Sequence, residues 1–212
     1  MEIWAVVVAG GTGARFGRPK QLAMLSGRRV IDRSIDALRP HSAGVVVVGS
    51  DAVGTASELA VADVAPPGPT RSASVRSGLS RLPASATHVL IHDAARPLVP
   101  DAVVASVVRA LSDGANAVVP VTPVTDTLRA ATGGTVDRSA YVAVQTPQGF
   151  ELATLAAAHA DGADATDDAA VIERNGTDVV HVDGSPINLK NTFPHDLVVA
   201  EALLADTQRE SA

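Results

Sequence analysis

Short apolar runs alternate along the chain with longer stretches in which apolar side chains recur every three or four residues. The Val-rich runs suit strands that are buried on both faces. Those between them have helical spacing. This alternation predicts an α/β fold, a Rossmann-like, mostly parallel sheet with helices on both faces. The expected strands are "WAVVVA", "GVVVVG", "THVLIHD" and "ANAVVPV", and the expected helices are "RVIDRSIDAL", "TRSASVRSGLSRL" and "DAVVASVVRALSDG".

The pattern changes between Pro123 and Phe150, where Gly133 and Gly134 stand between two polar, β-branched flanks. Paired glycines in such a setting are typical of a hairpin turn. We therefore expect a protruding β-hairpin arm at residues 123–145 on a single domain spanning 1–212. The α/β pattern then resumes with helices at "ELATLAAAHA" and "TDDAAVIERNG", strands at "DVVHVDG" and "INLKN", and a closing helix near "PHDLVVAEALLADTQ".

Composition narrows the class of protein. The 212 residues are 46% hydrophobic but only 2% aromatic, so alanine and valine fill the core. A formal net charge of −6 disfavours a surface for nucleic-acid backbone, which needs clustered cations. Cysteine is absent, and no apolar run approaches the ~20 residues of a membrane span. The start "MEIWAVVVAGG" lacks the basic lead of a signal peptide, so we expect a cytoplasmic protein with no nucleic-acid or membrane partner.

The loop "GGTGARFGRPKQ" follows the first expected strand, at the sheet edge where α/β proteins bind ligands. Gly11 and Gly13 permit positive φ and let backbone N–H groups approach an anion. The loop lacks the Gly-Lys-Ser/Thr ending of a Walker loop and fits only a loosened dinucleotide fingerprint. Arg15 and Lys20 favour a reacting triphosphate, whose developing charge needs paired cations. The alternative is two solvated surface cations.

Further polar residues follow later expected elements. Asp93 and Arg96 end the strand "THVLI" at the same edge, where a carboxylate can hold Mg²⁺ or a sugar hydroxyl and a guanidinium can meet a phosphate. The alternative is an internal ion pair, with His92 packed in the core. Ser74 lies in a Ser/Thr-rich helix start, where hydroxyls cap free N–H groups or touch a ligand. Thr166 is expected to be the N-cap of its helix.

Six further motifs follow the glycine-rich loop, in the order in which they occur in a known family. Together with the glycine-rich loop they resemble the nucleotidyltransferases that make nucleoside diphosphate sugars and alcohols. The likeness narrows to the 2-C-methyl-D-erythritol 4-phosphate cytidylyltransferase family of non-mevalonate isoprenoid biosynthesis. The motifs are "RSASVRSGL" at 71–79, "HDAARP" at 92–97, "PVTDTL" at 123–128, "QTPQGF" at 145–150, "TDDA" at 166–169 and "NLKNTFPHDL" at 188–197.

The resemblance implies transfer of a cytidylyl group from CTP to 2-C-methyl-D-erythritol 4-phosphate, with Mg²⁺ as cofactor and pyrophosphate as the second product. In such an enzyme, Arg15 and Lys20 stabilise the transition state, while Arg138 and Lys190 orient the attacking phosphate. Asp93 binds metal or substrate. The resemblance also implies a homodimer in which the arm reaches the neighbouring pocket. The implied substrate-binding residues are Ala9, Gly10, Gly11, Gly13, Gly68, Ser74, Asp93, Arg96, Thr127 and Thr166.

Three observations keep other interpretations open. Pro69 stands where many relatives carry an acidic residue, which puts one base contact in doubt. A ribitol 5-phosphate cytidylyltransferase would share the first loop and the "TPQ" stretch, although "HDAARP" favours the isoprenoid enzyme. A nicotinamide-dependent oxidoreductase would use the loosened glycine fingerprint with Asp51, but that residue comes later than the usual ~20 positions after the glycines.

Overall fold

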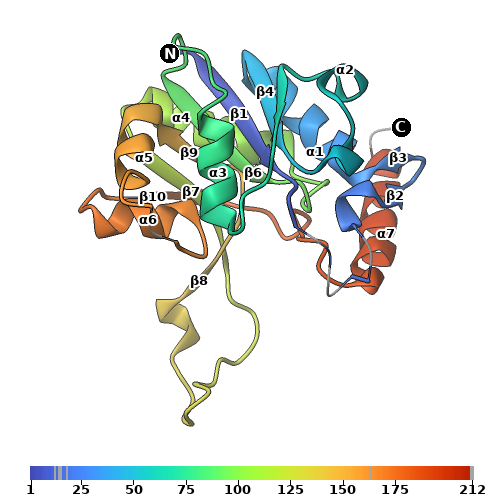
Figure 1. The fold of residues 1–212 in the computed structure, drawn as a ribbon. Coiled ribbons are helices and arrows are strands. Elements are labelled where there is room, and N and C mark those ends of the chain that lie inside the picture. The colour runs from blue at the N-terminus through green and yellow to red at the C-terminus, as the bar shows by residue number, and fades with distance from the viewer. Residues whose placement is uncertain (12, 14–15, 18, 163, 211–212) are drawn as a thin grey trace.

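The computed structural model describes residues 1–11, 13, 16–17, 19–162 and 164–210. Within this part of the chain, eight strands form one sheet in the order β10-β7-β9-β6-β1-β4-β5, with β8 pairing to β7 off that path (Figure 1). The strands are β1 (Ile3–Val8), β4 (Gly44–Val48), β5 (Asp63–Ala65), β6 (His88–Asp93), β7 (Ala117–Pro123), β8 (Val142–Val144), β9 (Gln148–Glu151) and β10 (Val180–Asp183).

The sheet is mostly parallel, as the sequence predicts. β1 pairs in parallel with both β4 and β6, β4 with β5, and β7 with β10. β9 runs antiparallel between β6 and β7. Because β1 and β6 are parallel neighbours, the loops that follow them leave from one edge of the sheet. The first loop and the residues after Asp93 therefore meet there, as expected.

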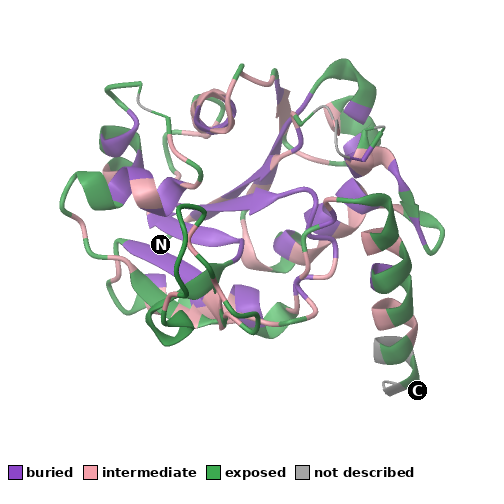
Figure 2. Ribbon diagram, turned by 90° about the horizontal axis from the view of Figure 1, so that it is seen from below, coloured by how far each residue is buried: buried purple, intermediate pink, exposed green. Residues whose placement is uncertain are grey.

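Alternation along β1 divides the core between two faces. Ala5 and Val7 pack with apolar side chains of α1 (Val30–Leu38) and α4 (Asp101–Ser112). Val6 packs on the other face, with residues of α3 (Arg71–Leu79), α5 (Leu152–Ala158) and α6 (Asp168–Arg174). Each fully buried valine, leucine or isoleucine of these two faces contributes on the order of 2 kcal/mol. Figure 2 shows the central strands buried and the outward faces of the helices exposed.

A third apolar cluster lies beside the sheet edge that carries the first loop. α7 (Pro194–Glu210) packs through Ala200 against Leu25 of a small antiparallel pair, β2 (Met24–Leu25) with β3 (Arg28–Arg29). Phe16 is buried in the same cluster. This anchors the chain on the amino-terminal side of the 3-10 helix η1 (Lys20–Leu22), which carries Lys20.

The arm leaves the sheet at the end of β7 and returns as β8, and Figure 1 shows it projecting from the body. Near its tip Arg129 and Thr135 form an antiparallel bridge, and the Gly133 N–H donates to the Ala130 carbonyl. The predicted protruding hairpin is confirmed. The return strand and the residue before it expose apolar side chains, including that residue, Tyr141, at 52%.

Two local expectations are wrong. The stretch "INLKN" is not a strand: residues 184–193 form turns and irregular backbone, so Lys190 lies on a loop. The N-cap of α6 is Asp167, whose carboxylate accepts from the Ala170 N–H, and not Thr166. Asp168, the first residue of α6, is fully buried. The remaining short elements are α2 (Ala56–Leu59), η2 (Arg39–His41), η3 (Asp51–Val53) and η4 (Arg138–Ala140). No helix in the described ranges is long and apolar enough to cross a membrane.

Candidate active site

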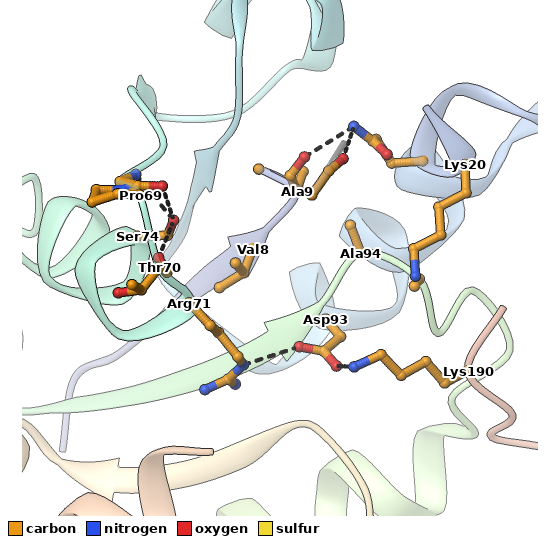
Figure 3. A pocket seen from close by; sticks show the side chains of 15 residues that line it. Val8, Ala9, Lys20, Pro69, Thr70, Arg71, Ser74, Asp93, Ala94 and Lys190 are labelled. Atoms are coloured by element: carbon orange, nitrogen blue, oxygen red, sulfur yellow. Dashed lines mark hydrogen bonds and ion pairs between the residues drawn. The ribbon is translucent and has the colours of Figure 1, made fainter. Parts of the chain in front are cut away.

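A cavity of about 370 Å³ opens at the carboxyl edge of β1 and β6 (Figure 3). Its wall is built from the first loop, η1, the loop before α3, the residues after β6 and the loop that carries Lys190. The structure therefore brings together segments from both ends of the chain. Of the residues expected in the site, those that line the cavity are Ala9, Gly10, Gly11, Lys20, Gly68, Ser74, Asp93 and Lys190.

Two glycines let the walls approach closely. A Cβ at Gly10 would lie 2.5 Å from the Pro67 Cβ, and one at Gly68 would lie 2.5 Å from the Ala73 Cβ. Neither position can carry a larger residue without moving the backbone. The Gly68 N–H donates to the Ser74 Oγ at 3.0 Å, which fixes the loop against the start of α3. Ser74 thus shapes the cavity as well as lining it.

Gln21 holds the first loop in place, and its position at the end of the motif is the only sign of this role in the sequence. Its Nε2 donates to the Ala9 carbonyl at 3.0 Å and the Gly11 carbonyl at 3.4 Å. The side chain is 6% exposed. These bonds hold η1 beside β1, and Figure 3 shows Lys20 extending from η1 into the cavity. Gly13 has φ +70°, as expected, but does not line the cavity.

Asp93 is held between two cations. Its Oδ2 lies 2.6 Å from the Lys190 Nζ, and its Oδ1 lies 3.5 Å from the Arg71 Nε (Figure 3). Burial raises the pKa of Asp93, but attraction to Lys190 and Arg71 outweighs burial and holds that pKa well below its usual range. Asp93 is therefore an anion at neutral pH.

Arg71 links the cavity to a second, fully buried carboxylate. Its Nη1 lies 2.7 Å from the Asp168 Oδ2, and the Asp168 Oδ1 lies 3.2 Å from the His159 Nε2. Burial lowers the pKa of Arg71, but the attraction of Asp168 and Asp93 reverses that effect, so the guanidinium stays charged. The sequence predicts no role for Arg71, because nothing in it places this residue beside the acids 22 and 97 positions later.

His92 is fully buried, so the interpretation that it packs in the core is confirmed, and it supports the backbone of Asp93 from the interior. Its Nε2 lies 3.1 Å from the Arg96 carbonyl, which can only accept, so this nitrogen carries the proton. Its Nδ1 then accepts from the Thr146 hydroxyl at 3.0 Å, and the Thr146 Oγ1 accepts from the Asp93 N–H at 3.1 Å. Burial lowers the pKa of His92 to about 4, and the nearby Asp93 offsets this only in part.

This pKa predicts a loss of stability in mild acid. The unfolded chain binds a proton at His92 near pH 6.5, whereas the folded chain does not until about pH 4. Stability therefore falls as pH drops through this window, by on the order of 2 kcal/mol between about pH 7.5 and about pH 5. The free energy of unfolding, measured with urea at several pH values, should be closer for the wild type and His92→Gln as pH falls. The two plots of this free energy against pH should therefore converge. Parallel curves would contradict the assignment.

Several expected site residues lie away from the cavity. The Arg96 guanidinium donates to two backbone carbonyls, those of Asn188 at 2.6 Å and Val144 at 3.2 Å, and is 9% exposed. Thr127 and Arg138 lie on the exposed arm, where the Arg138 Nη1 donates to the Thr125 carbonyl. Thr166 precedes the α6 cap and does not line the cavity. Arg15 lies outside the described residues.

A glycine-walled cavity at the carboxyl edge of a mostly parallel sheet, with cationic side chains set around one carboxylate, defines a nucleotide-binding α/β enzyme of the phosphoryl-transfer type. Residues 3–206 match the family model described as "IspD: 2-C-methyl-D-erythritol 4-phosphate cytidylyltransferase". The chain belongs to this family.

Individual relatives agree over nearly the full length. The chain is 44% identical to the 2-C-methyl-D-erythritol 4-phosphate cytidylyltransferase of Rhodococcus jostii, over 95% of each protein. It is 42% identical to that of Saccharopolyspora erythraea, over 97% of this chain and all of that one. The crystal structure of the Thermus thermophilus enzyme superposes with a TM-score of 0.83 at 39% identity, covering 96% of this chain and 98% of that one.

Proposed function

We propose that the protein transfers a cytidylyl group from CTP to 2-C-methyl-D-erythritol 4-phosphate, releasing pyrophosphate. The observation that carries this is that Lys20 and Lys190, from two separate segments, both line the cavity that contains Asp93, within a chain that belongs to the cytidylyltransferase family. One cation lies on the glycine-rich wall suited to a triphosphate. The other lies where an incoming phosphate can reach it.

In the proposed reaction an anionic oxygen of the acceptor phosphate attacks the α-phosphorus of CTP in line. The new P–O bond forms as the bond to the bridging oxygen of the β-phosphate breaks, and pyrophosphate leaves with that electron pair. A phosphate monoester has its second pKa near ~6, so no base is needed to create the nucleophile. Lys20 would stabilise the charge that grows on the transferred and leaving groups. Lys190 would hold the acceptor phosphate in line.

Mg²⁺ fits this site through one carboxylate. Asp93 is the acid that lines the cavity, and Mg²⁺ is commonly held by one or two carboxylates together with substrate phosphates. Among the described residues no group of three or more metal-ligating side chains occurs, so substrate oxygens and water would complete the shell. When bound, the ion supplies neutralisation of phosphate charge. Lys190 would then exchange its contact with Asp93 for one with the acceptor phosphate.

We further propose that the arm serves a second copy of the chain. Thr127 and Arg138 are exposed and lie away from the cavity of their own subunit. The returning segment of the arm exposes three apolar side chains, Tyr141, Val142 and Val144. Apolar side chains on a projecting ribbon favour coverage by another protein surface. A two-fold dimer would place each arm against the partner's cavity, where Arg138 could hold the acceptor phosphate with Lys190.

The direct test is pyrophosphate release with Mg²⁺, each of the four common nucleoside triphosphates in turn, and either methylerythritol phosphate or ribitol 5-phosphate. We expect turnover with CTP and methylerythritol phosphate. Comparison of the two alcohols addresses the ribitol enzyme, which resembles this chain in the first loop. Equal or greater turnover with ribitol 5-phosphate would overturn the acceptor assignment, and turnover with another nucleotide would overturn the choice of CTP.

A further inference from the structure

Lys190 lies on a loop, yet the loop is firmly held. Residues 184–193 form no helix or strand, and Asn188 and Asn191, on either side of the lysine, are both fully buried. A long side chain on an unsupported loop would not stay aligned with a reacting group. Other side chains must therefore fix the backbone that carries Lys190.

Gln145 pairs with this loop through its side-chain amide. Its Nε2 donates to the Ser185 carbonyl at 2.8 Å, and its Oε1 accepts from the Ser185 N–H at 3.1 Å. The same Oε1 accepts from the Asn188 Nδ2 at 3.1 Å. The amide of Gln145 thus takes the place that a neighbouring strand would have, and it holds the loop before Lys190.

Asn188 extends the contact to the segment that follows the arm. Its Nδ2 also donates to the Thr146 carbonyl at 2.9 Å, while its own carbonyl accepts from Arg96, which also binds the Val144 carbonyl. On the other side of Lys190 the Asn191 N–H donates to the Ala95 carbonyl at 2.8 Å. The loop is therefore fastened on both sides of the lysine.

The same cluster fixes the partner of Lys190. Thr146, whose carbonyl accepts from Asn188, accepts at its hydroxyl from the Asp93 N–H. Both members of the Lys190–Asp93 pair are thus fixed to residues 145–146, where the arm returns to the sheet. A change in this short segment would therefore shift the Asp93 carboxylate and the Lys190 ammonium together.

From these contacts we infer that Gln145 and Asn188 are positioning residues that hold Lys190 for the acceptor phosphate and tie it to the root of the arm. The inference deepens the proposed function and rests on it for the identity of the acceptor. It also gives a role to the motifs at 145–150 and 188–197. From the sequence alone, Lys190 is the one residue of these motifs for which a role is expected. Neither amide lines the cavity, so each would act through Lys190 and not on the substrate.

The first test is Asn188→Ala, which removes both Nδ2 bonds and keeps the carbonyl that Arg96 uses. We expect kcat/KM for methylerythritol phosphate to fall by about 10-fold or more, with the KM for CTP changed by less than about twofold. The KM for CTP should hardly change because the glycine-rich wall around Gly10 and Gly68, where CTP would bind, does not depend on this loop. If the alanine variant does not fold, Asn188→Ser keeps one donor and should change the same constants in the same direction.

Gln148→Ala is the matched control. Gln148 is a fully buried amide of the same stretch, but its Nε2 donates to Asp167 at the start of α6. We expect this variant to lose stability without a selective fall in kcat/KM for methylerythritol phosphate. An equal, acceptor-specific loss in this control would overturn the inference.

A double-mutant cycle with Lys190→Ala separates positioning from general support. If Asn188 acts through Lys190, adding Asn188→Ala to Lys190→Ala should lower kcat/KM by less than about twofold further. Multiplying losses would overturn the inference. Hydrogen exchange without substrate gives a readout independent of activity: exchange should rise in residues 184–193 of Asn188→Ala, and an unchanged pattern would overturn positioning. An inactive wild type would overturn the proposed function instead and leave the exchange result standing.

Discussion

Lys20→Ala is expected to lower turnover by at least about 100-fold while substrate affinity changes much less. Removing one preorganised charge that acts mainly in the transition state costs roughly 3 kcal/mol. The structure supports this choice because Lys20 lines the cavity from η1. The next residue of η1, Gln21, donates hydrogen bonds to the Ala9 and Gly11 carbonyls and so holds η1 in place. Arg15→Ala should behave alike. The measurement is the rate of pyrophosphate release at saturating CTP and acceptor.

Arg109→Ala provides the charge-matched control for Lys20→Ala. Arg109 is exposed on α4 and does not line the cavity, so its removal changes the net charge by the same amount at a distance from the site. We expect this variant to keep wild-type turnover. Near wild-type turnover of Lys20→Ala at saturating substrates would show that the first loop is a structural turn with surface charges.

The sequence predicted the elements whose signal is local. Val-rich runs and three-to-four-residue spacing located β1, β4, β6 and β7 and the helices α1, α3 and α4 to within a few residues. β9 was missed because four residues following a hairpin arm have no period to detect. The prediction of a strand at "INLKN" is wrong. Its alternating apolar and polar residues belong to a loop in which Asn188 is bonded to the buried Gln145.

The candidate site divides in the same way. Glycines and cations in one loop pointed to the cavity, because their chemistry can be interpreted without knowing the fold. Arg71, Gln145 and Asn188 were not assigned because their partners are distant in sequence: Arg71 meets Asp168 across 97 positions, and Asn188 meets Gln145 across 43. The sequence pattern of Arg96 is typical of a phosphate ligand, but the fold brings the Asn188 carbonyl of the Lys190 loop and the Val144 carbonyl of β8 within its reach.

Mixing Lys20→Ala subunits with Arg138→Ala subunits should restore activity that neither variant has alone. If the arm serves the partner, a mixed dimer contains one cavity with the intact Lys20 of one chain and the intact Arg138 of the other. Its second cavity carries both defects. Random pairing makes half of the dimers mixed, so about a quarter of all cavities become whole. Activity should rise toward that fraction under conditions that let dimers reassort.

The control is a mixture of Lys20→Ala with Lys190→Ala. These two residues line the same cavity of one chain, as Figure 3 shows, so every cavity in a mixed dimer keeps one defect. This mixture should stay inactive whether or not the arm is exchanged. If Arg138 serves its own subunit, the first mixture stays inactive as well. A flat result in both, with subunit exchange confirmed by mass-tagged chains, would rule out the shared site, because the Arg138 guanidinium would then have to act within its own chain.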